Sequence, residues 1–160
     1  MAYEFDLTTE WDLSAPVSPV WAALRAVEAW PAWWRSVRKV EPLVAGSESG
    51  IGAVHRLTWQ TALPYRLVLT TEVTAVQPER RIEVRARGDI EGTGVWTLLP
   101  RERDGCRVRY LWRVRVTKPW MRAVLPVLKP AFAWNHREVM RIGGAGMARL
   151  LANGNSNARG

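Results

Sequence analysis

The last third of this 160-residue chain constrains its fold more than any other feature. Residues 106–117 alternate apolar side chains with arginines, which is the two-residue period of a half-buried strand. The segment 130–151 then repeats apolar residues every three or four positions, which is the period of a helix with one buried face. The buried stripe of this helix is predicted to contain Phe132, His136, Met140 with Val139, Gly143, Met147 and Leu151. This ending predicts a sheet that grips one helix and leaves space for a ligand between them.

Shorter alternating runs precede this ending and predict the rest of the sheet. They cover residues 3–13, 36–44, 52–61, 65–74, 80–88 and 95–100. A Gly-rich corner is expected at 88–94 and a hairpin at Asp104-Gly105. Two short helices are expected after the first strand, at 20–24 and 28–34, because prolines stand near the start of both. The predicted class is therefore α+β, with a curved antiparallel sheet of about seven strands around a long C-terminal helix.

Charge predicts one strand pairing. The outward positions of the first run are acidic and those of the last run are basic. They are Glu4, Asp6, Glu10 and Asp12, and Arg107, Arg109, Arg113 and Arg115. Opposite charges on neighbouring strands contribute about 0.2–1 kcal/mol each, so the first and last strands are predicted to be neighbours.

Three glycines interrupt the predicted C-terminal helix. Gly143, Gly144 and Gly146 each cost about 0.8–1 kcal/mol against alanine inside a helix. Close packing of the helix on the sheet would offset that cost, so we expect the helix to lie nearest to its neighbours there. The cavity is then expected where the helix stands farther off.

Length and composition set the limits of the interpretation. A chain of 160 residues that is 48% hydrophobic is typical of one globular domain, predicted here over 1–151 with a disordered tail at 152–160. The net charge of +8 invites a nucleic-acid interpretation, but the arginines alternate along strands and form no basic run. We interpret them as a solvated strand face and predict no nucleic-acid partner. Attraction to acidic partners or to a membrane surface stays open.

Compartment signals favour the cytoplasm. The only cysteine, Cys106, excludes an internal disulfide, and the acidic residues among the first thirteen differ from a signal peptide. The longest run without charge, 13–24, is too short for a membrane span of about 20 apolar residues. We predict no transmembrane helix.

Several motifs resemble a known family. They lie at 15–21 (APVSPVW), 30–33 (WPAW), 88–96 (GDIEGTGVW), 118–121 (KPWM) and 134–136 (WNH), with Met140 following. Together they resemble the START-like SRPBCC superfamily, in particular a bacterial subgroup of its polyketide cyclase/dehydrase and lipid-transport branch. The resemblance spans residues 3–151 and implies a helix-grip fold with a hydrophobic cavity. The superfamily includes lipid carriers, aromatic cyclases, plant hormone receptors and chaperone-activating modules, and it has no universal catalytic motif.

The two histidines are the candidates for chemistry. His55 and His136 fall on apolar faces, and Tyr65 and Tyr110 are predicted to point inward as well. His136 could act as a general base while Tyr110 or Tyr65 stabilises an oxyanion, which is the work of a cyclase or dehydratase. The other interpretation is that the histidines only hydrogen-bond buried partners or orient a ligand.

The cavity lining follows from strand parity and from the helix stripe. It is predicted to contain His55, Trp59, Tyr65, Leu67, Trp96, Tyr110, Trp112, Phe132, His136 and Met140. So many flat rings suit an apolar or aromatic ligand, although core packing explains most tryptophans equally well. A further group, Trp30, Trp33, Trp34 and Trp120, could form a lid, touch a membrane beside the basic residues Arg35, Arg38 and Lys39, or simply pack short helices on the sheet.

Two other groups are set aside. Asp89 and Glu91 are predicted to point outward and to keep a hairpin soluble, rather than to act as an acid and base pair. Two histidines and one thiol are few ligands, so we predict no metal site and no cofactor.

Three functions remain. The first is binding or transport of a hydrophobic small molecule, lipid-like or polyketide-like, in the cavity. The second is a cyclase or dehydratase that uses His136. The third is a module that binds a protein partner through the basic outer face.

Overall fold

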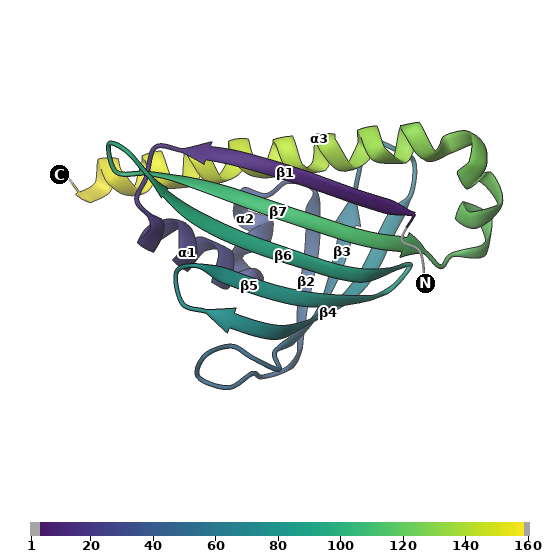
Figure 1. The fold of residues 1–160 in the computed structure, drawn as a ribbon, viewed down its shortest axis with the longest axis horizontal. Helices are drawn as coiled ribbons and strands as arrows, with labels where there is room; N and C mark the ends of the chain where they lie inside the picture. Colours follow the sequence, from purple (N-terminus) through teal and green to yellow (C-terminus); the bar gives the residue numbers. More distant parts are fainter. Residues whose placement is uncertain (1–3, 159–160) are drawn as a thin grey trace.

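The computed structural model describes residues 4–158, with side chains described as far as Gly154. Its centre is a seven-stranded antiparallel sheet in the order β1-β7-β6-β5-β4-β3-β2. The strands are β1 (Phe5–Leu13), β2 (Val37–Val44), β3 (Val54–Gln60), β4 (Arg66–Gln77), β5 (Arg81–Gly88), β6 (Ile90–Arg101) and β7 (Gly105–Val116). In Figure 1 the fainter β2 and β3 lie behind the front strands, and the helix α3 (Pro119–Ala158) runs lengthwise beside the sheet. This arrangement confirms the predicted α+β class and the helix-grip fold.

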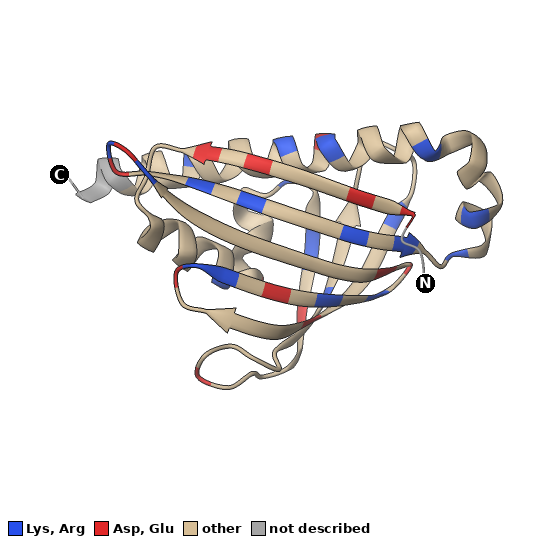
Figure 2. Ribbon diagram, viewed as in Figure 1, with Lys and Arg blue, Asp and Glu red and all other residues tan. Residues whose placement is uncertain are grey.

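The first and last strands are neighbours, as the charge pattern predicts. β1 pairs antiparallel with β7, and the register sets Glu10 opposite Arg109 and Asp12 opposite Arg107. The Arg109 Nε atom lies 3.1 Å from Glu10 Oε1, and Arg107 Nε lies 2.8 Å from Asp12 Oδ1. Hydrogen bonding with Arg107 lowers the pKa of the Asp12 carboxyl. Figure 2 shows the acidic positions along β1 beside the basic positions along β7.

Short helices follow β1. They are α1 (Val17–Arg25), a 3-10 turn η1 (Val27–Ala29) and α2 (Trp30–Trp33). The predicted second helix at 28–34 is thus divided between η1 and α2. Pro31 lies in the first turn of α2, where its missing N–H costs nothing.

The Gly-rich corner is shorter than the predicted range 88–94. The chain turns at Gly88 and Asp89, and β6 already begins at Ile90. Gly92 and Gly94 are paired within the sheet, opposite Val114 and Trp112 of β7. Glycine is needed at both positions for the strands to pair this closely. A Cβ at Gly92 would strike the main-chain oxygen of Arg113, and one at Gly94 would lie 2.7 Å from the Tyr110 hydroxyl.

The helix α3 is longer than predicted at both ends. It starts at Pro119, eleven residues before the predicted start at Pro130, and contains Pro126 and Pro130. A proline inside a helix removes a hydrogen bond and bends the axis, and Figure 1 shows the bend near the start of α3. At the other end the backbone stays helical to Ala158, so the part of the predicted disordered tail at 152–158 is helical instead. Extending a formed helix adds a hydrogen bond for each residue without a new nucleation cost. Residues 159–160 of that tail, like Tyr3 of the predicted first strand, lie outside the described residues.

The glycines of α3 bring the helix against the tryptophans of the core. A Cβ at Gly143 would collide with atoms of the Trp34 ring, and one at Gly144 would lie 2.8 Å from the Trp11 ring. A Cβ at Gly146 would strike the main-chain oxygen of Trp33. The predicted close packing is therefore confirmed, and it fixes the C-terminal half of α3 on α2 and β1.

Candidate cavity site

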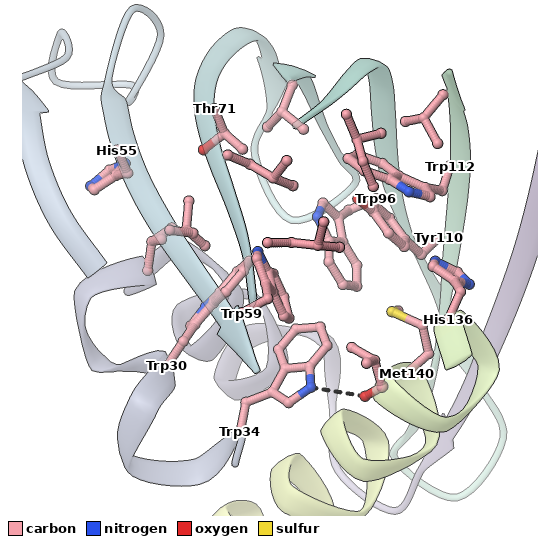
Figure 3. A pocket seen from close by; sticks show the side chains of 18 of the residues that line it. Trp30, Trp34, His55, Trp59, Thr71, Trp96, Tyr110, Trp112, His136 and Met140 are labelled. Carbon is pink, nitrogen blue, oxygen red and sulfur yellow. Dashed lines mark hydrogen bonds between the residues drawn. The ribbon is translucent and has the colours of Figure 1, made fainter. Parts of the chain in front are cut away.

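A cavity of about 220 Å³ lies between the sheet and α3. Its walls are the inward side chains of β1 and β3–β7, together with residues of α1, α2 and α3. Figure 3 shows these side chains converging from the strands, from Trp30 and Trp34 on one side and from His136 and Met140 on another. The walls are mostly apolar and aromatic, which is typical of sites for small organic ligands.

The structure places every residue of the predicted lining on the wall of this cavity. The set is His55, Trp59, Tyr65, Leu67, Trp96, Tyr110, Trp112, Phe132, His136 and Met140. That these residues bind a ligand stays a prediction.

Tryptophans form one end of the cavity as a packed cluster around Trp34. The Trp34 ring centroid lies 5.1 Å from that of Trp59 and 5.3 Å from that of Trp30. Its indole N–H donates to the main-chain oxygen of Val139 at 2.9 Å, and the Trp11 indole donates to that of Met140 at 3.0 Å. These bonds tie the wall of the cavity to α3.

The tryptophans predicted as a lid lie in two different environments. Trp30, Trp33 and Trp34 are buried, which agrees with the alternative that they pack short helices on the sheet. The glycines of α3 allow this packing, because they admit rings beneath the helix. That these tryptophans form a lid or touch a membrane stays a prediction. Trp120 is 45% exposed at the start of α3, with its ring 5.5 Å from Tyr65 of the cavity wall. Membrane contact through Trp120 stays a prediction.

His136 is half-buried on the inner face of α3, and its Nδ1 atom is buried. Burial lowers its pKa to about 4, and the positive charge of Arg137 acts in the same direction. The imidazole is therefore neutral at pH 7. Among the described residues, its Nδ1 atom has no hydrogen-bond partner.

The two tyrosines of the wall are poor acids. Tyr110 lies between Trp96 and Trp112, with ring centroids at 4.0 Å and 5.7 Å, and burial raises its pKa above the usual value. Burial raises the pKa of Tyr65 to about 12, although a hydrogen bond with the Asn135 side chain opposes the rise. Within the described part of the chain, no hydrogen bond joins either hydroxyl to His136. The fold brings the proposed base and oxyanion donors to one cavity without pairing them.

His55 lies apart from His136, at the opposite side of the cavity in Figure 3. Its Nε2 atom is 3.7 Å from Glu28 Oε1 of η1. Nearby, Arg25 and Ser49 belong to the cavity wall and are exposed, which indicates that the cavity opens between α1 and the β2–β3 loop. The Arg25 guanidinium reaches across this opening to the main-chain oxygen of Glu48 at 3.4 Å.

Asn135 is a wall residue that the sequence analysis missed. Its side chain is only 4% exposed and lines the cavity beside His136. Phe132, Asn135, His136 and Val139 follow the spacing i, i+3, i+4 and i+7, so the helix period could have identified it. A polar residue on this otherwise apolar helix face was the sequence signal that could have identified Asn135.

Three buried polar atoms of the wall have no hydrogen-bond partner among the described residues. They are Trp59 Nε1, Asn135 Oδ1 and His136 Nδ1. Buried polar groups in proteins are nearly always paired, so each of these atoms needs an explanation.

The acidic pair of the β5–β6 turn plays no part in this wall. Asp89 Oδ2 accepts hydrogen bonds from the main-chain N–H of Val68 at 3.0 Å and from Lys118 at 3.3 Å. Glu91 accepts from Arg115 at 2.8 Å. Both carboxylates therefore bind groups at the surface of the sheet, which agrees with the prediction that they point outward. Among residues 4–158, no three His, Cys, Asp or Glu side chains are grouped so that they could hold a metal ion.

The curved sheet, the long helix α3 and the apolar cavity between them define the helix-grip class of folds. Residues 4–145 match the family described as polyketide cyclase/dehydrase and lipid transport, and the chain belongs to that family. The family and the fold together indicate hydrophobic-ligand binding or polyketide-cyclase-type activity. A comparison with curated proteins gave no match.

Solved structures with the same fold differ widely in sequence. A START superfamily protein from Mycobacterium smegmatis is 13% identical with a TM-score of 0.76, covering 92% of this chain and 97% of its own. A protein from Thermus thermophilus is 19% identical with a TM-score of 0.68, covering 89% of this chain and 96% of its own. The Zhui aromatase/cyclase from Streptomyces sp. R1128 is 17% identical with a TM-score of 0.66, covering 91% of this chain and 95% of its own. At these identities the likeness concerns the fold alone. Within the described residues, none of the helices combines the length and the apolar character that a membrane span requires.

Proposed function

We propose that this protein binds and carries a hydrophobic small molecule, lipid-like or polyketide-like, in the cavity between the sheet and α3. The observation that carries the proposal is the wall itself, in which apolar and aromatic side chains enclose about 220 Å³. Burying apolar surface contributes about 25 cal/mol for each Å² removed from water, so such a wall favours apolar ligands. The family description, which names lipid transport beside cyclase and dehydrase activity, supports the same proposal.

The tryptophan cluster adds a reason for affinity. Trp34 is held by its bond to Val139, and Trp30 donates to the main-chain oxygen of Ala23 at 3.3 Å. Rings that are already fixed lose little freedom when a ligand arrives, and such preorganisation strengthens binding.

A cyclase or dehydratase that uses His136 has less support. A general base works best when its pKa lies near the working pH, and the pKa of His136 is lowered to about 4. Neither Tyr65 nor Tyr110 is positioned on His136 by a hydrogen bond in the part of the chain that the structure describes. The third option, a partner-binding module, has the least support, because arginines of the outer face such as Arg107 and Arg109 are already paired with carboxylates.

Native mass spectrometry of protein purified from its own host tests the proposal. We expect a bound apolar molecule at one copy per chain, identified after extraction. Protein that stays empty, and that takes up neither fatty acids nor aromatic compounds when they are added, would overturn the proposal. If the extracted molecule is converted by the wild type and only bound by a His136→Ala variant, the enzyme function replaces the carrier function.

A further inference from the structure

Exposed apolar side chains gather on the first part of α3. Nine large apolar side chains are exposed among the described residues, and four of them lie within residues 119–134, here called the bent segment. The four are Trp120, Val127, Leu128 and Trp134, and Val127 is 80% exposed. Apolar side chains that gather on a surface mark an interaction site, whereas single scattered ones do not.

The bent segment projects from one end of the molecule. It contains Pro126 and Pro130, and Figure 1 shows the bend of α3 beyond the end of β7. Every residue from 126 to 130 is exposed. This position leaves the side chains of the bend accessible to a large flat surface.

The opposite side of the bent segment is held by the core. Met121, Leu125 and Phe132 are buried and belong to one cluster with Phe5 and Trp112. These contacts fix the backbone of the segment, so its outer apolar side chains can be replaced without unfolding it.

Positive charge surrounds the exposed apolar side chains. The sequence has no aspartate or glutamate between Asp104 and Glu138. Within and beside the bent segment, Arg122, Lys129 and Arg137 are exposed, and none of the three forms an ion pair with a described residue. Figure 2 shows basic but no acidic positions along this part of α3. The bent segment therefore carries a positive charge that no described neighbour neutralises.

The arginines on the outer face of the sheet differ in this respect. Arg107 and Arg109 of β7 are paired with carboxylates of β1. Their charge is largely cancelled by these neighbours, whereas the cations of the bent segment are available to a partner. A partner that fits the bent segment has to offer negative charge next to an apolar layer.

A bilayer with anionic lipids has both properties. The apolar side chains of an interfacial helix enter the boundary of the acyl chains, while Lys and Arg keep their charged ends among the lipid headgroups. Tryptophan is enriched at this interface, which suits Trp120 and Trp134. The bent segment is shorter than the about 20 residues that a membrane span needs, so we expect it to lie on the surface.

We propose that the bent segment docks this protein on bilayers that contain anionic lipids, with Trp120 and Val127 entering the headgroup region. The inference goes beyond the proposed function and does not depend on it, because docking needs no ligand. Met121 and Phe132 of the same segment line the cavity, so docking sets one wall of the cavity next to the bilayer. A bilayer dissolves apolar molecules and is therefore a source of ligand at that wall.

Flotation of the full chain with lipid vesicles tests the inference. The vesicles contain phosphatidylcholine alone or phosphatidylcholine with phosphatidylglycerol, which is anionic. Each basic side chain near an anionic surface strengthens binding about fivefold, so we expect the anionic vesicles to bind at least about tenfold more tightly. In about 1 M salt the Debye length falls to about 3 Å, and most of this difference should disappear.

Matched variants locate the docking surface. Val127→Asp should weaken binding to the anionic vesicles at least about tenfold, since it replaces an apolar contact by a negative charge. Leu150→Asp makes the same change in charge at an exposed position near the other end of α3 and should bind nearly as tightly as the wild type. Arg122→Ala should weaken binding about fivefold, and Arg149→Ala, also at an exposed position, should not. Circular dichroism establishes that each variant is folded.

A spectroscopic readout tests whether the bent segment enters the bilayer. Bromine atoms on the acyl chains quench the fluorescence of an indole that comes close to them. Trp120 and Trp134 are the exposed tryptophans among the described residues, so a double variant, Trp120→Phe with Trp134→Phe, should lose the quenching that the wild type shows. Vesicles without bromine are the control.

The outcomes separate this inference from the proposed function. The inference is wrong if no vesicle binds, if neutral and anionic vesicles bind alike, or if Val127→Asp and Leu150→Asp bind alike. It is also wrong if light scattering shows a dimer that Val127→Asp dissociates, since the surface then joins two copies of this chain. In each of these cases the carrier function stands. A protein that docks on vesicles but carries no apolar molecule retains the inference and loses the carrier function.

Discussion

Trp34 donates its indole N–H to the main-chain oxygen of Val139, 2.9 Å away, from the space that a side chain at position 143 would fill. In a helix the carbonyl of residue i points toward residue i+4, so a glycine at 143 opens the approach to the oxygen of residue 139. The same relation joins Trp11 to Met140 beside Gly144. The glycines therefore set both the distance of α3 from the core and the position of the tryptophan wall.

Gly143→Ala is expected to lower the free energy of unfolding by about 1–3 kcal/mol, because the new methyl group collides with the Trp34 ring. Urea denaturation measures the change. Gly154→Ala is the matched control on the same helix, where nothing lies within 4 Å of the added Cβ. That variant should be unchanged or up to about 1 kcal/mol more stable, since alanine is the better helix former. Equal effects at both positions would contradict the close-packing explanation.

Acid is expected to destabilise the protein through His136. Burial lowers the pKa of this group from 6.5 to about 4, so between these values the unfolded chain binds a proton that the folded chain does not. Above about pH 6.5 the imidazole is neutral in both states and costs no stability. As the pH falls toward 4, the free energy of unfolding decreases by up to about 3 kcal/mol. Urea denaturation at pH 7 and pH 4.5 measures it.

His136→Leu should lose less stability over this pH range than the wild type. A His136→Leu variant with an unchanged pH dependence would show that this histidine does not titrate as its burial predicts.

Charge reversal at Glu10 tests the pairing of β1 with β7. Glu10→Lys sets a cation opposite Arg109 and should destabilise the protein by about 0.2–1 kcal/mol. Arg109→Glu in the same chain restores an opposite pair and should recover most of the loss. A double variant that is no more stable than the sum of the single variants predicts would argue against direct coupling.

Thr71→Trp is expected to reduce ligand binding by at least about tenfold, because Thr71 lies on the cavity wall and a large ring would occupy the space of the ligand. Thr70→Trp is the matched control, since alternation along β4 turns the neighbouring threonine to the other face of the sheet. The amount of co-purified or added ligand per chain, measured by native mass spectrometry, compares the two. Equal occupancy in both variants would place the ligand outside the cavity.

Local pattern and charge predicted most of the architecture. The alternation of Phe5, Trp11 and Leu13 with acidic residues identified β1, and its charges identified β7 as its neighbour. The stripe from Phe132 to Met147 identified the inner face of α3. These inferences succeeded because burial follows the period of each element, and the period is a property of the sequence alone.

Features that depend on contacts between distant segments were not predictable in this way. The early start of α3 keeps Pro126 and Pro130 inside the helix, against the usual preference, and the pairing of Gly92 and Gly94 with β7 extends β6 into the predicted corner. Trp33 and Trp34 are buried because glycines more than a hundred positions away admit them beneath the helix. Asn135 enters the wall through the same packing.

The amino-acid sequence by itself determined the strands, the inner face of the long helix and the residue types of the cavity wall, since hydrophobic period and charge are local properties. Only the tertiary structure decided the volume of the cavity, the burial that makes His136 a weak base, and the three polar atoms that lack partners among the described residues. Each of these depends on how closely α3 approaches the sheet. That distance is set by side chains of both partners together, because the glycines of α3 and the tryptophans of the core have to fit into one space.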